Sequence, residues 1–293
     1  MATLYTSKDA NIKKTWLLMT VFFIFVIAVG WGISWYMGSS IILYIAVGIA
    51  ILMNIFSYWY SDKLVVKMTG AKPAPNEGRY EELHNIVENL AITAGLPKPR
   101  VYVIQDQGPN AFATGRNPEH ALITVTTGLL DLLERVELEG VIAHEMSHIK
   151  NRDILIGTVA VVLAGFIAIL ADIFIRMSIF GIGGDNDNKS GWIMIIGIIL
   201  AILAPLAAKM IQLAVSRKRE FLADSSGALL TRYPEGLASA LEKISGKGEM
   251  KKAGYSTAHL FIVNPFGGKK SFTKFFMTHP PVEERIKALK TQA

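Results

Sequence analysis

The feature that most constrains this chain is a long stretch, Thr15–Ser61, that contains no Asp, Glu, Lys or Arg. A helix rises about 1.5 Å per residue and needs about 20 apolar residues to cross a bilayer. The stretch is therefore long enough for two membrane spans, which we predict near Thr15–Met37 and Ile41–Tyr60, with Gly38-Ser39-Ser40 as the turn. The first span is too long for a signal peptide and is followed at once by the second, so we interpret it as a permanent anchor.

Two further charge-free runs, Ile154–Ala171 and Ser190–Ala208, just reach spanning length. Because they consist mainly of Ile, Leu, Val, Ala and Gly, we predict two more spans, with buried core helices or a hairpin dipping into the bilayer as alternatives. The predicted organisation is two N-terminal spans (1–61), a polar region (62–153), a hydrophobic pair (154–208) and a second polar region (209–293). The two polar regions are expected to build one mixed α/β core.

Lys and Arg gather at one end of each predicted span, which predicts that both termini and the polar regions lie in the cytoplasm, at the cell (inner) membrane. The net charge of +6 comes largely from these clusters, which suit anionic lipid headgroups and argue against nucleic-acid binding. The absence of cysteine excludes disulfides, thiolate metal sites and cysteine nucleophiles. The clusters include Lys8, Lys13 and Lys14, then Lys63, Lys67 and Lys72, then Lys150 and Arg152, and finally Arg217, Lys218 and Arg219.

The polar regions show patterns of both helix and strand. Apolar residues at helical spacing predict a helix over Tyr80–Ala94, and β-branched runs predict strands at Val101–Ile104 and Ala121–Thr126. The pattern favours an α+β class: a mostly helical unit with a small sheet, carried by a multi-pass membrane protein. We further predict an edge strand within Asn110–Gly115, a linker containing Pro73 and Pro75, helices over Glu137–Lys150, Met210–Leu230 and Pro281–Leu289, and a loop over Gly246–Gly268.

The motif that carries chemistry is His144-Glu145-Met146-Ser147-His148. Histidines four residues apart project from one helix face and can share a Zn²⁺ ion, while Glu145 can reach a metal-bound water and take its proton. The alternative is two exposed helix histidines beside an unrelated glutamate. The apolar residues before the motif and the polar residues after it favour a helix that lines a cleft.

Two histidines leave the metal short of a third protein ligand. Glu220 is the best candidate, and Asp224 lies four residues later, on the same helix face. Glu220 would then bind the metal while Asp224 accepts the second ring N–H of a ligand histidine. A solvated acidic pair beside Arg217 and Arg219 remains the alternative.

These motifs, with an Asn-Ala-Phe-Ala-Thr-Gly segment at Asn110 and His279-Pro280-Pro281 near the end, resemble the HtpX family of bacterial membrane zinc endopeptidases, which is related to the CAAX prenyl proteases. The resemblance covers essentially the whole chain and implies a zincin-like metalloprotease fold for its polar regions. It implies one zinc ion per subunit, held by His144, His148 and Glu220, with Glu145 as general base. It also implies a substrate-binding strand at Asn110, Ala111 and Phe112, and a role for His279 in stabilising the oxyanion. His279 could instead be a surface residue.

We therefore expect a zinc endopeptidase that cleaves misfolded or regulated membrane proteins on the cytoplasmic side, in membrane protein quality control. A site buried in the bilayer is disfavoured because charged residues, Glu134 to Glu139, precede the motif. A second alternative is a non-catalytic metal-binding scaffold or transporter. The oligomeric state is left open.

Overall fold

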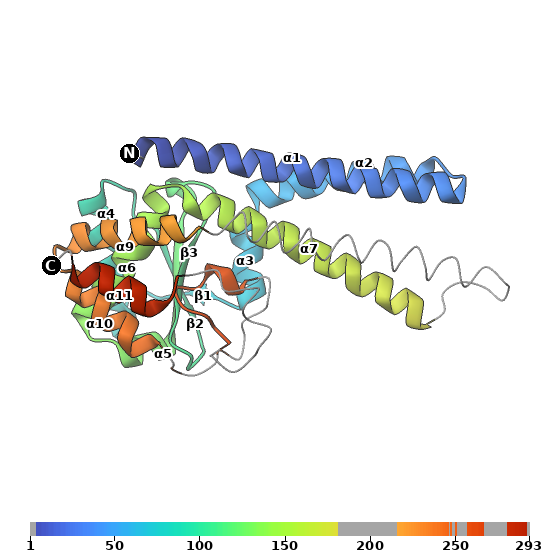
Figure 1. Cartoon of the computed structure of the whole chain (residues 1–293). Coiled ribbons are helices and arrows are strands. Elements are labelled where there is room, and N and C mark those ends of the chain that lie inside the picture. Colours follow the sequence, from blue (N-terminus) through green and yellow to red (C-terminus); the bar gives the residue numbers. More distant parts are fainter. Residues whose placement is uncertain are drawn as a thin grey trace.

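Two long apolar helices, α1 (Leu4–Met37) and α2 (Ile41–Trp59), form a hairpin that projects from the rest of the chain in the computed structural model (Figure 1). The structure describes residues 4–180, 216–245, 247, 250, 257–266 and 280–291. The hairpin confirms the predicted turn, where Gly38 has a φ of 63°. A side chain at Gly30 would collide with Ala46, so small residues let the two helices touch.

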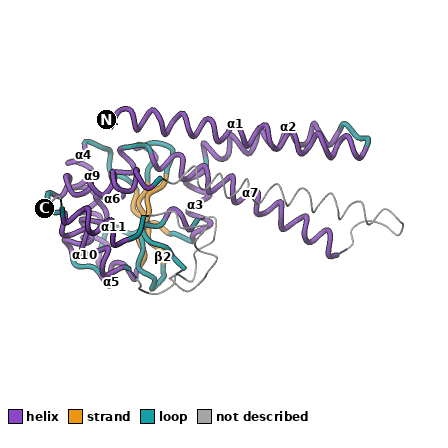
Figure 2. The backbone as a smooth tube through the Cα atoms, in the orientation of Figure 1, coloured by secondary structure: helices purple, strands orange, loops and turns teal. Residues whose placement is uncertain are grey.

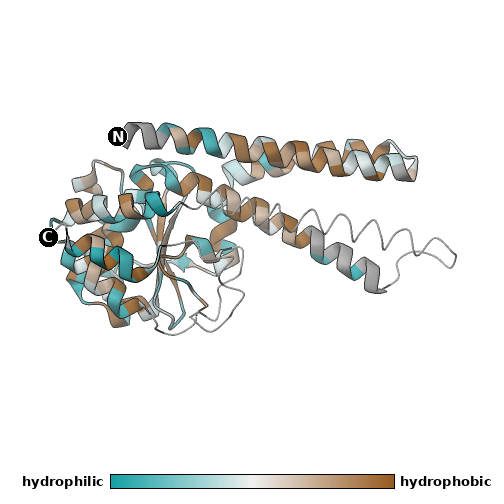
Figure 3. Ribbon diagram, viewed as in Figure 1, coloured by the Kyte–Doolittle hydropathy of each residue, from teal (hydrophilic) through white to brown (hydrophobic). Residues whose placement is uncertain are grey.

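Both helices of the hairpin are long and apolar enough to cross a membrane, over Asp9–Trp35 and Ile41–Trp59. Figure 3 shows hydrophobic residues along both, and large side chains such as Trp31 and Ile45 are more than half exposed. Such a surface is costly in water and suits lipid. The two predicted N-terminal spans therefore have the required helices.

The third predicted span, Ile154–Ala171, lies within helix α7 (Asp153–Phe180). Its first turns are buried, with Ile156, Val159 and Leu163 packed against the Leu18 and Phe22 side chains of α1. Its described part, Asp153–Ile169, is long and apolar enough for a span when taken together with the preceding helix α6 (Arg135–Lys150), from which it is bent by 84°. Its beginning is thus a core element of the protein. The fourth predicted span, Ser190–Ala208, lies outside the described residues.

A four-stranded mixed sheet has the order β1-β2-β4-β3. Strands β2 (Arg100–Ile104) and β4 (Leu122–Thr126) are parallel, while β3 (Ala111–Thr114) pairs antiparallel with β4. These three strands confirm the predicted ones, with β3 at the edge. Strand β1 (Lys72–Pro73), which pairs antiparallel with β2, falls in the predicted linker. Two residues give no alternating pattern, so sequence reasoning missed it.

Both faces of the sheet are covered by helices, as Figure 2 shows. Alternate residues such as Val103, Ala111 and Ile123 join the main core, whereas Phe112 packs on the opposite face with Val161 and Phe261. The main core combines residues from before and after α7, so the two polar regions share one core. The helices around the sheet are α3 (Ser61–Thr69), α4 (Glu81–Ala94), α5 (Thr127–Leu132), α6 (Arg135–Lys150), α9 (Arg217–Thr231), α10 (Pro234–Ile244) and α11 (Val282–Lys290).

The described residues also contain three short 3₁₀ helices: η1 (Gly78–Tyr80), η2 (Pro118–His120) and η3 (Ala258–Leu260). The predicted helices over 80–94, 137–150 and 281–289 correspond to α4, α6 and α11. Helix α9 matches the later part of the predicted Met210–Leu230, and its earlier residues lie outside the described part. Helix α10 was not predicted.

Helix α6 is central, and glycines let its neighbours approach it closely. A Cβ at Gly140 would lie 2.6 Å from the backbone nitrogen of Leu237 in α10. A Cβ at Gly227 of α9 would lie 2.9 Å from the backbone nitrogen of His144 in α6. Because these contacts are with backbone atoms, a side chain at either glycine would force one of the two helices to move. The two glycines therefore set how near α9 and α10 come to α6.

The start of α6 is held by Glu137, which is buried. It caps the helix through the backbone N–H of Glu134 at 2.9 Å and accepts hydrogen bonds from Ser239 at 2.6 Å and Lys243 at 2.8 Å in α10. Burial acts to raise the pKa of Glu137, but the hydrogen bonds from Lys243 and Ser239 outweigh it and lower the pKa below 4.5.

We predict that Glu137→Ala lowers the free energy of unfolding by about 2–3 kcal/mol, because it removes a cap and a buried charged contact. Thermal unfolding in detergent measures the effect. A lowered carboxyl pKa stabilises the fold above the ordinary pKa and is lost as pH falls, so the deficit should shrink below about pH 4.5. The matched control is Glu139→Ala, which removes only the surface pair with Arg135 and should cost less than about 1 kcal/mol. Equal losses for both variants would contradict this account.

Candidate metal centre

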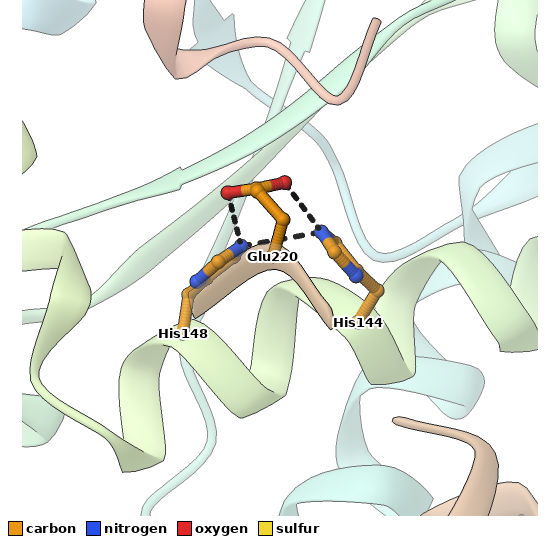
Figure 4. A group of neighbouring side chains, drawn as sticks. All are labelled: His144, His148 and Glu220. Atoms are coloured by element: carbon orange, nitrogen blue, oxygen red, sulfur yellow. Dashed lines mark hydrogen bonds and ion pairs between the residues drawn. The ribbon is translucent and has the colours of Figure 1, made fainter. Parts of the chain in front are cut away.

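Three side chains from two helices converge on one point. His144 and His148 lie one turn apart on α6, and Glu220 reaches them from the first turn of α9 (Figure 4). The two Nε2 atoms are 3.2 Å apart, and the carboxylate oxygens of Glu220 lie 3.8 Å from His144 Nε2 and 3.7 Å from His148 Nε2. Ligands about 2.0–2.1 Å from a tetrahedral zinc ion lie about 3.3 Å from one another. The three predicted ligands are thus brought together at metal-binding distances.

The imidazole of His144 is fixed from behind by Asp224 of α9. Its Nδ1 lies 2.9 Å from Asp224 Oδ1, so Nδ1–H donates and Nε2 faces Glu220 with its lone pair. Arg285 of α11, fully buried, donates from Nε to Asp224 Oδ2 at 2.8 Å and from Nη2 to Oδ1 at 2.7 Å. Burial acts to raise the pKa of Asp224, but Arg285 outweighs it and holds the pKa at about 2.

His148 has a matching support that sequence reasoning missed. Its Nδ1 lies 3.0 Å from Asp153 Oδ2, at the first residue of α7. Asn11 of α1 donates to the other oxygen of Asp153 and to the backbone carbonyl of Asn151, and it accepts from Arg219 of α9 at 2.9 Å. Burial acts to lower the pKa of His148, but Asp153 and Glu220 outweigh it and raise the pKa to about 9.

The donor set fits a metal ion such as zinc. Each histidine uses Nδ1 for an aspartate, which leaves its Nε2 for the metal, and the third donor is a carboxylate. Two histidines and one glutamate are a known ligand set of catalytic zinc, which keeps a fourth position open. A cavity of about 50 Å³ adjoins the three side chains and supplies space for that position.

Glu145 follows His144 directly in the sequence, and its side chain also lines this cavity. It is buried, and burial raises the pKa of its carboxyl, although the charges of both histidines and a backbone hydrogen bond from Ala113 oppose the shift. A carboxylate with a raised pKa is better matched to accepting a proton near neutral pH. Glu145 therefore lines the same cavity as the three candidate ligands.

The predicted substrate strand is partly covered by the chain itself. In the 257–266 segment, the Ile262 N–H donates to the Ala111 carbonyl at 3.0 Å, and Asn110 bonds the backbone of Val263 through its side chain. Phe112 is buried against Phe261, with ring centroids 5.2 Å apart. In β3, the residue that lines the metal cavity is Ala113, next to these three.

Two further histidines, His259 and His279, differ in what the structure shows of their positions. The side chain of His259 in η3 is buried and lines the metal cavity, although its sequence surroundings carry no metal-binding pattern. His279, the predicted oxyanion residue, lies outside the described residues. Arg285, six residues later, does reach the site, and no spacing rule links it to His144 in the sequence.

We predict that Arg285→Lys weakens metal binding by about 10- to 100-fold, the usual cost of disturbing the partner of a ligand histidine. A lysine keeps the charge beside Asp224 but cannot hold both carboxylate oxygens at once. Competition with a chelator of known zinc affinity measures the change without requiring catalysis. Lys287→Ala, an exposed cation on the same helix, serves as control and should leave the affinity unchanged. Wild-type affinity in Arg285→Lys would contradict the role.

Comparisons with known proteins agree with this centre. The pattern of peptidase family M48 matches residues 77–293. The Protease HtpX homolog of Caldanaerobacter subterraneus subsp. tengcongensis is 49% identical over 297 residues, covering 99% of this chain and 98% of the relative. That of Pyrococcus furiosus is 52% identical over 263 residues, covering 88% of this chain and 89% of the relative.

The crystal structure of Ste24p from S. mikatae superimposes with a TM-score of 0.50 at 17% identity, over 97% of this chain and 67% of that one, which shows a shared fold. The sequence matches go further, because they cover nearly the whole chain at close to half identity. The chain therefore belongs to peptidase family M48 and is a membrane metallopeptidase of the HtpX type.

Proposed function

We propose that this metallopeptidase is a zinc endopeptidase that cleaves misfolded or regulated membrane proteins on the cytoplasmic side of the cell membrane, as part of membrane protein quality control. The observation that carries the proposal is the convergence of His144, His148 and Glu220 around a cavity that Glu145 also lines. That arrangement supplies three metal ligands and a proton acceptor within one buried space.

A zinc ion held there would polarise the scissile carbonyl and lower the pKa of a bound water. Glu145 accepts a proton from the attacking water as its oxygen bonds to the carbonyl carbon, and it later gives that proton to the leaving amine as the C–N bond breaks. The products are a carboxylate and an amine. Asp224 and Asp153 keep the two imidazoles in the tautomer that leaves Nε2 for the metal.

For substrate binding we propose that an extended peptide pairs with the edge of β3, at the end where Ala113 lines the cavity. Asn110, Ala111 and Phe112 would extend this binding edge. For that, the hydrogen bond from the Ile262 N–H to the Ala111 carbonyl must first break, so that the 257–266 segment exposes the strand. His279 would donate to the oxyanion. The approach of Arg285 to His144 supports this role, because it brings the chain just after His279 to the site.

We further propose that the chain crosses the membrane four times, with both termini and the metal centre in the cytoplasm. Helices α1 and α2 supply two spans, and α7 leads outward from the metal helix α6. The exposed residues Glu134 and Arg135 begin α6, which favours a site beside the bilayer rather than inside it. A metal-binding scaffold or transporter without catalysis would not need a proton acceptor such as Glu145 beside the metal ligands.

We predict that Glu145→Gln lowers casein cleavage by about 10²- to 10⁴-fold, because the general base is lost. Zinc content, measured by mass spectrometry of the metal in the purified protein, should remain at one ion per chain. Glu220→Ala should lose zinc together with activity. Removing zinc from the wild type with a chelator should abolish cleavage, and returning zinc should restore it.

Glu139→Gln, on the same helix as Glu145 but at its surface, is the matched control and should cleave casein at the wild-type rate. Undiminished cleavage by Glu145→Gln would reject the mechanism. Restoration by another divalent metal but not by zinc would reject the choice of ion.

We predict that single cysteines report the proposed orientation directly, because the natural chain has none. A membrane-impermeant maleimide added to intact cells should label Ser40→Cys, in the turn between α1 and α2, and spare Asn85→Cys, on the exposed face of α4. Both should react after the membrane is opened. The reverse pattern in intact cells would place the metal centre on the outer side.

A further inference from the structure

Aromatic and basic residues mark one level along the α1–α2 hairpin. Trp16 of α1 stacks on Tyr58 of α2 with ring centroids 5.9 Å apart, and α2 ends at Trp59. Trp59 is 52% exposed and Tyr60 is 43% exposed. Trp and Tyr collect where hydrocarbon gives way to headgroups, and lysines follow on the polar side. This level is therefore where the headgroups of a surrounding bilayer would lie.

A cavity of about 510 Å³ opens at the same level. Its walls come from the end of α2, the start of α3 and the loop that follows β3, and they include Trp59, Tyr60, Lys63, Arg116 and Glu119. The volume lies within the range of about 300–1,000 Å³ that is typical of small-molecule sites. Different residues line the metal cavity, so the two spaces have separate walls.

The cations of this cavity differ in their partners. Arg100 is paired with Asp62 at 2.7 Å. Lys63 and Arg116 form no ion pair with any carboxylate in the described part of the chain; the Lys63 ammonium lies 5.3 Å from the centroid of the Tyr60 ring. Two positive charges thus face one cavity without carboxylate partners in the described residues. Glu119 is the remaining acid in the wall.

Arg116 is also fixed in place. Its guanidinium lies 4.5 Å from the centroid of the Trp59 ring, and Nη1 donates to the Trp59 carbonyl at 3.3 Å. Its Nη2 lies 2.7 Å from Nε2 of His120, which is held through Nδ1 by Asn117 at 2.6 Å. An arginine has five N–H donors, and these contacts occupy two. Three N–H donors of Arg116, which lines the cavity, therefore remain for other acceptors.

We propose that this cavity binds a phosphate group, and that its occupant is the headgroup of an anionic phospholipid. Arg and Lys side chains are the usual partners of phosphate, and the aromatic rings of Trp59 and Tyr60 suit the boundary between headgroup and acyl chain. Glu119 is placed to accept a hydrogen bond from a headgroup hydroxyl. The inference rests on the membrane insertion of α1 and α2 that is part of the proposed function.

The test counts phospholipids retained by the detergent-purified protein in native mass spectrometry, after exposure to phosphatidylglycerol or phosphatidylcholine. The wild type should retain phosphatidylglycerol preferentially. Lys63→Gln/Arg116→Gln should weaken that retention by about 10- to 30-fold, from the loss of two cations beside the lipid. Lys67→Gln/Lys72→Gln removes the same charge from exposed neighbouring positions outside the cavity and should retain lipid as the wild type does.

Equal losses in the two double variants would overturn the site, because they would show a general charge effect. Displacement of the lipid by glycerol phosphate at the same concentration would assign the cavity to a soluble phosphate and overturn the lipid assignment. Because Arg116 also contacts α2, Lys63→Gln alone is the second variant. Its side chain is exposed on α3, so it should keep the wild-type melting temperature and still lose several-fold in retention.

The measurement is made in the Glu145→Gln protein, so that lipid binding is read without proteolysis. Failure of the proposed catalytic mechanism then appears in the casein assay alone. Failure of the lipid site appears in the retention assay alone, and failure of membrane insertion appears in the maleimide labelling.

Discussion

The close approach of α9 to α6 is the contact on which the metal centre depends. Gly227 lies against the backbone at His144, where any side chain would collide with the helix. This approach brings Glu220, two turns earlier on α9, to the two histidines of α6, and it brings Asp224 to the back of His144. A motif on one helix becomes a three-ligand centre only because a second helix can lie this close.

Each ligand histidine is held by an aspartate, and each aspartate is held by a residue from a distant part of the chain. Arg285 near the C-terminus holds Asp224, while Asn11 near the N-terminus holds Asp153. The orientation of both imidazoles therefore depends on the complete fold rather than on α6 alone. Buried pairs of this kind are costly unless every partner is present, so the centre and the fold should be lost together.

Local patterns were enough to predict the helices of the hairpin, the three longer strands and the three side chains that converge as candidate ligands. His144 and His148 share a helix face, and the spacing of Glu220 and Asp224 gave them separate roles. Asp153, Asn11, Arg285 and His259 could not be found in this way. Their contacts depend on the bend of 84° between α6 and α7 and on pairs separated by more than 60 residues. Strand β1 and the covered edge of β3 likewise form only through tertiary pairing.

The contact of Asn11 joins the candidate metal centre to α1, the first of the two helices that are long and apolar enough to cross a membrane. Asn11 lies one turn before Thr15, where the charge-free part of α1 begins, and it bonds Asp153, the partner of His148, and Arg219, the neighbour of Glu220. A helix changes its tilt when its apolar length does not match the thickness of the bilayer. Because α1 is one continuous helix from Leu4 to Met37, a change in its tilt would move Asn11 relative to Asp153 and Arg219. In the membrane arrangement proposed above, the thickness of the bilayer would therefore act mechanically on the residues that hold the hydrolytic centre.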